Sequence, residues 1–420
     1  MIILDEVTRV KEYKQLEIPY SEEIYSLLES KNYSNLFENL SIKSVNDKFY
    51  ISMKTKFWIG LVKLGEHNII IEPGFSNAKF IYMLKFIEPD VISVLDEIFE
   101  GISFDDSFFE VFLKNFLKNV LEVLLFSRKK KYVSKTSNLM IPDGKLLLAK
   151  TINHQINGGV GFWVNQRRFT FDNIHNQIIK FTLNFLYPTI STMLESNINE
   201  VLSLLNQITL LPLLDSRNID GVLYDRSTYH YKKIHSICKL ILDQNEVSLL
   251  EGTKTFRSFF FNAWDIFEKF VRTIIQNSLI EKYIVEKSVE NTKNTSGLTL
   301  GNKFRNLPDI LIYDNDMNLK LILDAKYKHD ITKNDFNQAG NYIRKLMIDK
   351  NLPINNRNCI LIYPSSINLE NEERKLTIES KVDRNLKRGG SVYAYSIDLN
   401  QVDNEEYVEK WVNTIKDNFL

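Results

Sequence analysis

The chain has 420 residues, equal numbers of acidic and basic side chains, and an aromatic content of 12 %. This length is sufficient for two or three domains with separate cores, and the aromatic content excludes an intrinsically disordered protein. A formal net charge of zero argues against a stand-alone high-affinity DNA-binding protein, whose domains tend to be basic, and suits a protein that a partner delivers to DNA.

The N-terminal part of the chain is predicted to start with strands and to continue with helices. Residues 1–49 are expected to form a lead-in strand and small helices, and Phe49–Glu72 an antiparallel pair of strands. The elements expected next are a helical pattern over Ser76–Phe99 that breaks at Pro89, an amphipathic helix over Asp105–Lys130, a polar linker near Val133–Asn138, a long helix over Asp172–Ile208 interrupted around Pro188, and a helix over Thr228–Asp243.

The C-terminal part is predicted to combine helices with strands. Its expected elements are a helix over Phe256–Ile280, a polar loop or ragged hairpin over Lys287–Gly301, a hairpin of Ile310–Tyr313 and Leu319–Tyr327, a helix from Thr332 or Asn334 to about Asp349, strands over Asn358–Tyr363 and Ser391–Leu399, and a closing helix over Glu405–Phe419. This order predicts an α/β domain with a mixed central sheet.

Together these elements predict a multidomain protein of the α/β and α+β classes. An N-terminal region with antiparallel strands and helices is expected at residues 1–135, and a mainly helical middle region at residues 136–250. The α/β domain is expected at residues 251–420.

Two acidic residues and a lysine at the predicted hairpin give the strongest signal of function. Leu307-Pro308-Asp309 precedes the first strand, and Asp324-Ala325-Lys326 lies on the second. Side chains alternate along a strand, so Asp324 and Lys326 share one face, and the neighbouring strand can bring Asp309 beside them. This group suits phosphodiester cleavage, in which a hard divalent cation held by oxygen ligands polarises the phosphoryl group and activates a water.

In this interpretation Asp309, Asp324 and the backbone carbonyl of Ala325 are ligands of Mg²⁺. Lys326 would lie near the attacking water and the developing negative charge. The alternative is a surface hairpin with solvated charges, because the P-D…D-x-K motif alone is loosely defined. The neighbouring helices favour the metal site.

These helices carry further candidate residues. Glu268, on the helix before the hairpin, is a candidate metal ligand or else a salt-bridge partner of Arg272 four residues later. On the helix after the hairpin, Gln338 and Tyr342 lie one turn apart and share a face with Lys345. Polar groups there would contact phosphates or base edges of DNA beside the metal.

The rest of the chain offers weaker signals. Arg167-Arg168 is interleaved with aromatic residues, a mixture that either binds DNA by charge and stacking or forms an edge strand with a basic outer face. Neither a P-loop motif nor a histidine and cysteine cluster occurs in the sequence, so we expect no bound nucleotide and no zinc. Cys238 and Cys359 are expected to be reduced core residues, and without a signal peptide or a long apolar segment we expect a cytoplasmic protein away from the membrane.

The order of helices, strands and motifs at residues 251–420 resembles the restriction-endonuclease-like PD-(D/E)xK fold, and the Q-x-x-x-Y pair resembles its RecB-like branch. The chain also resembles the McrC family of modification-dependent restriction subunits, in the segments Phe57–Phe86, Gly144–Leu186 and Phe267–Val271. The resemblance spans roughly residues 50 to 365 in the right order. Members of the family carry Pro-Lys where this chain has Pro73-Gly74, so a contact made by that lysine is not carried over.

The resemblance to the McrC family implies the nuclease subunit of a McrBC-type restriction system. It implies a McrB-like AAA+ GTPase hexamer as partner, which recognises double-stranded DNA with modified cytosine. About residues 1–250, including the N-terminal docking region, would then dock into that ring and stimulate GTP hydrolysis. Residues 251–420 would cut the DNA with Mg²⁺ once translocating complexes collide or stall, and two nuclease domains would be able to pair for a double-strand break.

Two other classes of function stay open at this point. One is an autonomous RecB-like repair or phage nuclease, which would cut with metal alone. The other is a catalytically inert activator of a partner NTPase. The intact Asp309, Asp324 and Lys326 argue against the inert activator, because a decayed site would be expected to lose at least one of them.

Overall fold

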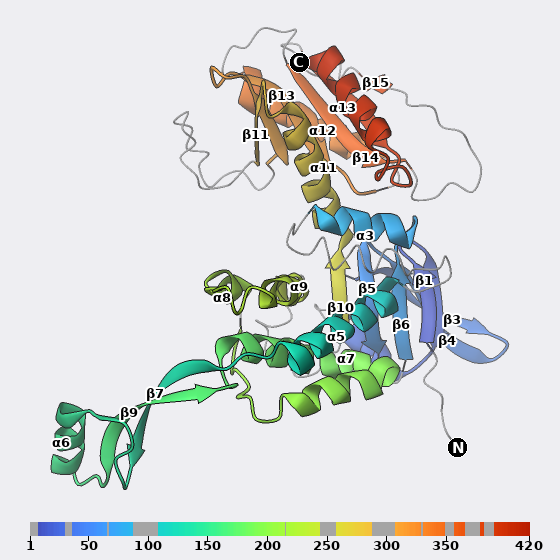
Figure 1. Ribbon diagram of the computed structural model, residues 1–420. Coiled ribbons are helices and arrows are strands. Elements are labelled where there is room, and N and C mark those ends of the chain that lie inside the picture. Colours follow the sequence, from blue (N-terminus) through green and yellow to red (C-terminus); the bar gives the residue numbers. More distant parts are fainter. Residues whose placement is uncertain are drawn as a thin grey trace. The chain divides into compact units, whose positions relative to one another are not determined.

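The computed structural model describes residues 7–29, 36–64, 67–86, 108–214, 216–243, 258–287, 307–328, 331–348, 357–365, 379–381 and 390–420. They form helices and several separate sheets, which confirms the predicted mixture of helices and strands (Figure 1). Their contacts separate two compact units, the first drawn from the ranges 1–89, 99–109 and 260–420 and the second from 90–98 and 110–259. Among the described residues, no helix is long and apolar enough to cross a membrane.

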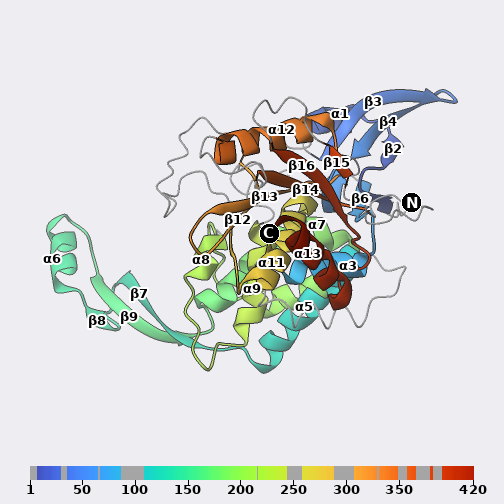
Figure 2. The same ribbon diagram turned by 90° about the horizontal axis from the view of Figure 1, so that it is seen from above.

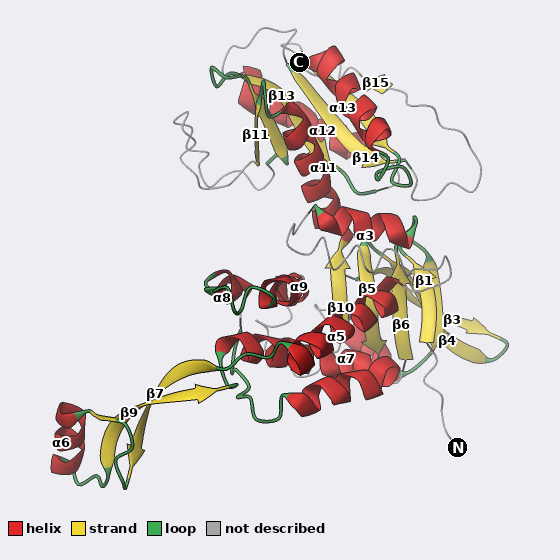
Figure 3. Ribbon diagram, in the orientation of Figure 1, coloured by secondary structure: helices red, strands yellow, loops and turns green. Residues whose placement is uncertain are grey.

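The N-terminal part of the first unit contains two sheets (Figure 3). One has the strand order β1-β6-β5-β10, with β1 parallel and β5 antiparallel to β6, and the other is antiparallel with the order β2-β4-β3. The elements are β1 (Val7–Lys11), β2 (Gln15–Pro19), α1 (Glu22–Glu29), β3 (Phe37–Val45), β4 (Lys48–Thr55), β5 (Trp58–Leu64), β6 (His67–Glu72), α3 (Asn77–Lys85) and β10 (Ser258–Asn262).

This part contains more strand than predicted. The antiparallel pair expected in Phe49–Glu72 is confirmed as β5 and β6. The prediction of small helices over residues 1–49 is wrong for most of the described segment, because buried Leu16 and Ile18 alternate with exposed neighbours, as on a half-buried strand. The predicted break at Pro89 lies outside the described residues.

The C-terminal part of the first unit is a layered α/β domain around a six-stranded sheet of the order β11-β12-β13-β14-β16-β15. Figure 2 shows α12 on one side of this sheet and α11 and α13 on the other. The elements are α11 (Ala263–Leu279), β11 (Ile284–Lys287), β12 (Ile310–Tyr313), β13 (Leu319–Ala325), α12 (Lys333–Ile343) with a π-helical turn at Arg344–Ile348, β14 (Asn358–Pro364), β15 (Glu379–Lys381), β16 (Ser391–Ile397) and α13 (Glu405–Phe419).

The mixed central sheet follows the predicted order of helix, hairpin, helix, strand, strand and helix. β12 and β13 are antiparallel, whereas β13, β14 and β16 run parallel to one another. The helix before the hairpin begins at Ala263 and not at Phe256, because the preceding residues form β10 and the Asn262 side chain accepts hydrogen bonds from the first helical amides. Phe260 therefore belongs to a strand and not to the predicted helical stripe.

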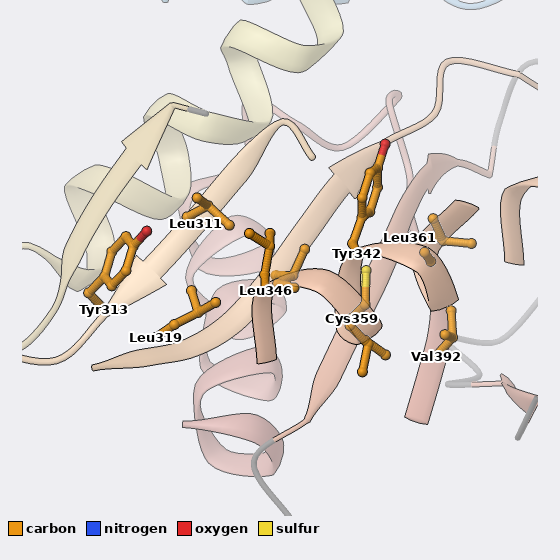
Figure 4. Close-up of a cluster of buried hydrophobic side chains, with 11 residues drawn as sticks. Leu311, Tyr313, Leu319, Tyr342, Leu346, Cys359, Leu361 and Val392 are labelled. Atoms are coloured by element: carbon orange, nitrogen blue, oxygen red, sulfur yellow. The ribbon is translucent and has the colours of Figure 1, made fainter. Parts of the chain in front are cut away.

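An apolar cluster fixes α12 on the sheet. Figure 4 shows Tyr342 and Leu346 of this helical segment over Leu311, Cys359 and Val392 of three strands. The predicted stripe of α12 contributes Ala339, Ile343 and Leu346 to the same cluster, and Phe336 packs against it. Burial of this face sets which side of the helix is turned to the sheet.

The second unit combines helices with a three-stranded antiparallel sheet of the order β7-β9-β8. Its elements are α5 (Phe108–Phe126), β7 (Lys131–Leu139), β8 (Lys145–Leu146), α6 (Leu148–Ile156), β9 (Phe162–Thr170), α7 (Ile174–Leu204), α8 (Ser216–Asp220) and α9 (Tyr231–Asp243). The predicted helices are confirmed as α5, α7 and α9. The interruption expected around Pro188 is not at that residue, since the irregular backbone lies at Leu194, with φ −131° and ψ 36°.

The predicted linker near Val133–Asn138 is instead part of a strand. β7 pairs with β9 along its whole length, from Lys131 opposite Thr170 to Leu139 opposite Phe162. Most residues of β7 are exposed, so β7 is held in place by backbone hydrogen bonds to β9 and not by burial of its side chains. A polar composition is compatible with such a ribbon, which explains why composition alone suggested a linker.

Gly144→Ala is expected to loosen the junction of β8 with β9. Gly144 has φ +117°, and a Cβ atom there would lie 2.7 Å from the backbone oxygen of Asn165. We expect a cost of about 1–3 kcal/mol and faster hydrogen–deuterium exchange in β9. Gly158 is the matched control, because it also has a positive φ, +80°, but a Cβ atom there meets nothing within 4 Å. Equal protection of β9 in both variants would contradict the prediction.

Candidate active site

Asp324 and Lys326 form a buried ion pair at the end of β13. Nζ of Lys326 lies 2.6 Å from Oδ2 of Asp324, and their side chains are 8 % and 1 % exposed. Neither oxygen of the Asp324 carboxylate accepts a hydrogen bond of good geometry from the described residues. The lysine is thus a close charge partner, while the carboxylate retains acceptor capacity of the kind that a cation uses.

Asp309 joins this pair from the neighbouring strand. The register of β12 and β13 places Ile310 opposite Leu323, so the preceding residue Asp309 falls opposite Asp324. Oδ2 of Asp309 accepts a hydrogen bond of 2.7 Å from the backbone amide of Ala325. Asp309 is partly exposed and Asp324 is fully buried, so solvent reaches the group from the side of Asp309.

The ionisable groups of Asp309, Asp324 and Lys326 shift one another's pKa values. Burial raises the pKa of Asp309 well above its ordinary value, and the charges of Asp324 and Glu268 add to this effect. Burial also raises the pKa of Asp324, although Lys326 opposes the shift. Burial lowers the pKa of Lys326, but the two aspartates outweigh it and the net shift is upward. The two neighbouring carboxyl groups therefore resist carrying two negative charges in this desolvated site unless a further cation balances them.

A magnesium ion fits this donor set. Among the described residues, no group of three or more His, Cys, Asp or Glu side chains could hold a metal, so a cation here would depend on two carboxylates. Mg²⁺ commonly binds through one or two carboxylates and completes its shell with waters and substrate phosphates. Oδ1 of Asp324 has no hydrogen-bond partner among the described residues, and the two carboxyl groups lie close together; a cation would relieve both features.

Glu268 lies close enough to influence this site but is already engaged in ion pairs. Its Oε1 is 2.9 Å from Nη1 of Arg272, one helical turn away, and 3.4 Å from Nζ of Lys287. Its charge still contributes to the raised pKa of Asp309. The structure thus contains the predicted salt bridge, and the role of Glu268 as a metal ligand stays a prediction.

Trp264 is a neighbour of the site that the sequence did not reveal. Its ring centroid lies 5.7 Å from Nζ of Lys326, in a cation–π arrangement. The helical period assigns Trp264 to the buried stripe of α11, yet this side chain is partly exposed. The sequence distinguishes Trp264 from the buried residues of α11 only by its place in the first turn, two residues after the capping residue Asn262.

Gln338 and Tyr342 contact each other and the chain just before Asp309. Nε2 of Gln338 donates to the Tyr342 hydroxyl over 2.5 Å, and this hydroxyl donates to the backbone oxygen of Leu307 over 3.1 Å. Tyr342 is 3 % exposed, whereas Lys345 is exposed in the π-helical turn. Gln338 and Tyr342 thus hold the backbone just before Pro308-Asp309. Contact of Gln338, Tyr342 and Lys345 with DNA stays a prediction.

Arg167 and Arg168 belong to the second unit, on the exposed part of β9. The guanidinium of Arg167 lies 4.9 Å from the ring centroid of Tyr132 on the paired strand β7. Nη2 of Arg168 lies 3.7 Å from Oδ2 of Asp143. The two arginines are exposed, but β9 lies between β7 and β8, so it is not the edge strand of the alternative prediction. DNA binding by these arginines stays a prediction.

Comparison with known proteins identifies the family. A sequence profile described as McrBC 5-methylcytosine restriction system component matches residues 53–364. A chain of the refined half-complex from the tetradecameric assembly of Thermococcus gammatolerans McrB AAA+ hexamers with bound McrC is similar over 98 % of this chain and 100 % of its own, with a TM-score of 0.60 and 15 % identity. A chain of the cryo-EM structure of the Thermococcus gammatolerans McrBC complex matches over 68 % of this chain and 90 % of its own, with a TM-score of 0.40 and 17 % identity. No curated protein matches the sequence.

The first of these structures shares its fold with nearly the whole of this chain, at an identity that supports the fold alone. The family profile covers most of the chain and includes Asp309, Asp324 and Lys326. The chain therefore belongs to the family of McrBC 5-methylcytosine restriction system components.

Proposed function

We propose that this chain is the Mg²⁺-dependent DNA endonuclease subunit of a GTP-driven restriction complex directed against DNA with modified cytosine. The observation that carries the proposal is the juxtaposition of Asp309, Asp324 and Lys326 at the ends of two neighbouring inner strands of a mixed sheet. The order of strands and helices around them supports a PD-(D/E)xK nuclease domain at residues 251–420. Membership of the restriction family supports DNA as the substrate.

The site residues divide into ligands and a charge donor. Asp309, Asp324 and the Ala325 carbonyl would hold Mg²⁺. When bound, the ion supplies polarisation of a phosphoryl oxygen and a water of lowered pKa. Lys326, held by Asp324 and Trp264, would orient the attacking water and stabilise the negative charge that develops on the phosphoryl group. The exposed side of Asp309 would face the DNA.

The partner would be a McrB-like AAA+ GTPase hexamer. The similar solved assembly consists of McrB AAA+ hexamers with bound McrC. The present sequence contains no P-loop motif, so the GTP would bind to the partner and not to this chain. The docking region at residues 1–135 and the helical region at residues 136–250 would contact the ring and stimulate its GTPase, and we place the complex in the cytoplasm.

Plasmid cleavage tests this function. The purified chain is incubated with Mg²⁺ and methylated or unmethylated plasmid, with and without the AAA+ protein encoded beside it and GTP. We expect double-strand cleavage only when partner, GTP and methylation are all present, because recognition and translocation would belong to the partner. Cleavage by the chain alone would contradict the restriction complex and favour an autonomous RecB-like nuclease. GTPase stimulation without any cleavage would favour an inert activator.

A further inference from the structure

Tyr327, which follows Lys326, is held at both its side chain and its backbone by two consecutive residues from the N-terminal part of the first unit. The Tyr327 hydroxyl donates to Oε1 of Glu12 over 2.6 Å. The Tyr13 hydroxyl donates to the backbone oxygen of Tyr327 over 2.8 Å. The Tyr327 ring is fully buried and packs on Phe267 of α11, with ring centroids 5.6 Å apart. A residue beside the candidate active-site lysine thus depends on contacts from the other end of the sequence.

Glu12 is itself fixed in place. It follows β1, and its backbone amide donates to the oxygen of Glu72 over 2.9 Å. Oε1 also accepts from the backbone amide of Gly74 over 2.8 Å, while Oε2 is buried with no hydrogen-bond partner among the described residues. Glu12 is only 1 % exposed, so its carboxyl group is a buried acceptor for the Tyr327 hydroxyl and not a surface acid.

The turn that carries Tyr13 is also rigid. Tyr13 has φ +58°, a left-handed conformation that a non-glycine residue adopts at a cost of roughly 1 kcal/mol or more. The Thr55 hydroxyl donates to the backbone oxygens of Lys11 and Lys14, over 3.0 and 3.2 Å, and accepts from the Lys14 amide over 3.1 Å. These bonds close the turn from which the Tyr13 hydroxyl reaches the backbone oxygen of Tyr327.

Lys326 lies at the point where the chain leaves the sheet. β13 ends at Ala325, and beyond it the Lys326 amide donates to the oxygen of Ile362 over 2.7 Å. The next residues leave the sheet, and the Lys328 amide turns back to the Lys326 oxygen over 2.9 Å. The ion pair with Asp324 and the ring of Trp264 hold the ammonium of Lys326. The contacts that hold Tyr327 add to these, because they fix the backbone that follows the lysine.

We propose that Glu12 and Tyr13 are positioning residues of the nuclease site, which hold Lys326 against Asp324 by fixing Tyr327. The proposal rests on the proposed nuclease function and adds to it a link between the N-terminal region and the cutting centre. Burial raises the pKa of Glu12 to about 7, and both the neutral and the ionised acid can accept from Tyr327 through Oε1. Glutamine preserves that acceptor, so Glu12→Gln should preserve the contact and Glu12→Ala should remove it.

The test compares Glu12→Ala, Glu12→Gln and Tyr327→Phe with the wild type in the complete complex with partner, GTP, Mg²⁺ and methylated plasmid. Glu12→Ala and Tyr327→Phe are expected to slow single-turnover cleavage roughly 10- to 100-fold, because a displacement of about 1 Å at a reacting group has effects of this size. DNA affinity and GTPase stimulation should stay at the wild-type level, and Glu12→Gln should cut at nearly the wild-type rate. Glu17→Ala is the matched control, since Glu17 lies on β2 of the same region and its ion pair with Lys43 is exposed.

Hydrogen–deuterium exchange at residues 326–328 is measured on the same proteins, with faster exchange expected in Glu12→Ala and no change in Glu17→Ala. Unchanged cleavage and unchanged exchange in Glu12→Ala would overturn the proposal. So would a simultaneous loss of DNA binding and GTPase stimulation, because that would indicate a general loss of structure. A wild-type complex that does not cut would count against the nuclease function alone, and the exchange measurement would still decide whether Glu12 fixes the Lys326 segment.

Discussion

Asp324→Ala is expected to abolish DNA cleavage while leaving stimulation of the partner's GTPase close to the wild-type level. The carboxylate is fully buried at the proposed cutting centre and is a proposed ligand of the metal. Charge stabilisation by a bound metal is worth several kcal/mol, and a loss of about 4 kcal/mol slows a reaction about 10³-fold. Docking to the partner is proposed to use other surfaces of the chain, so GTP hydrolysis should not depend on this side chain.

Two controls separate this loss of chemistry from a loss of folding. Asp324→Ala leaves Lys326 buried beside a reduced negative charge, which destabilises the domain, whereas Asp324→Asn keeps the shape of the side chain. Both variants should fail to cut. Asp316→Ala, in the exposed turn of the same hairpin, should cut normally. A well-folded Asp324→Ala protein that no longer stimulates the GTPase would contradict the proposed division between docking and cutting.

The elements that the sequence predicted well are those whose geometry is local. Asp324 and Lys326 lie two residues apart on a strand, so alternation alone places them on the same face. The turn between β12 and β13 is short, and the resulting register brings Asp309 opposite Asp324. β12 is a fully buried apolar strand and β14 a mostly buried one, and such segments are recognisable from composition.

The features that the sequence did not reveal depend on contacts between distant segments. Glu12 and Tyr327 are 315 residues apart and meet only because separate elements of the first unit pack together. The helical period puts Tyr342 on a polar face with Gln338, but the structure buries it in the apolar cluster under α12. β7 has no buried face to produce a pattern, so its pairing with β9 is not visible in the sequence.

Lys326→Ala is expected to lose most of the cutting rate and to bind the divalent cation at least as tightly as the wild type. The lysine is proposed to act on the attacking water and not to hold the metal, so its loss should affect the rate. The ammonium also competes with a cation for Asp324, since it lies 2.6 Å from that carboxylate. Its removal leaves the buried carboxylate of Asp324 and the partly exposed one of Asp309 without the ammonium beside them, and a bound cation would then balance their charge.

Stability should therefore depend more strongly on the metal in Lys326→Ala than in the wild type. We expect a lower melting temperature than the wild type in EDTA and a larger rise on addition of Mg²⁺, because a ligand at about 100 times its Kd stabilises the folded state by about 2.7 kcal/mol. Thermal unfolding across a Mg²⁺ titration measures both the stability and the affinity. Lys320→Ala is the matched control, since Lys320 lies on β13, which leads to Lys326, but pairs with Asp314 in the hairpin turn, 2.9 Å away. A fall in Mg²⁺ affinity as large as that of Asp324→Ala would mean that Lys326 supports the metal site itself, and its proposed role at the attacking water would be wrong.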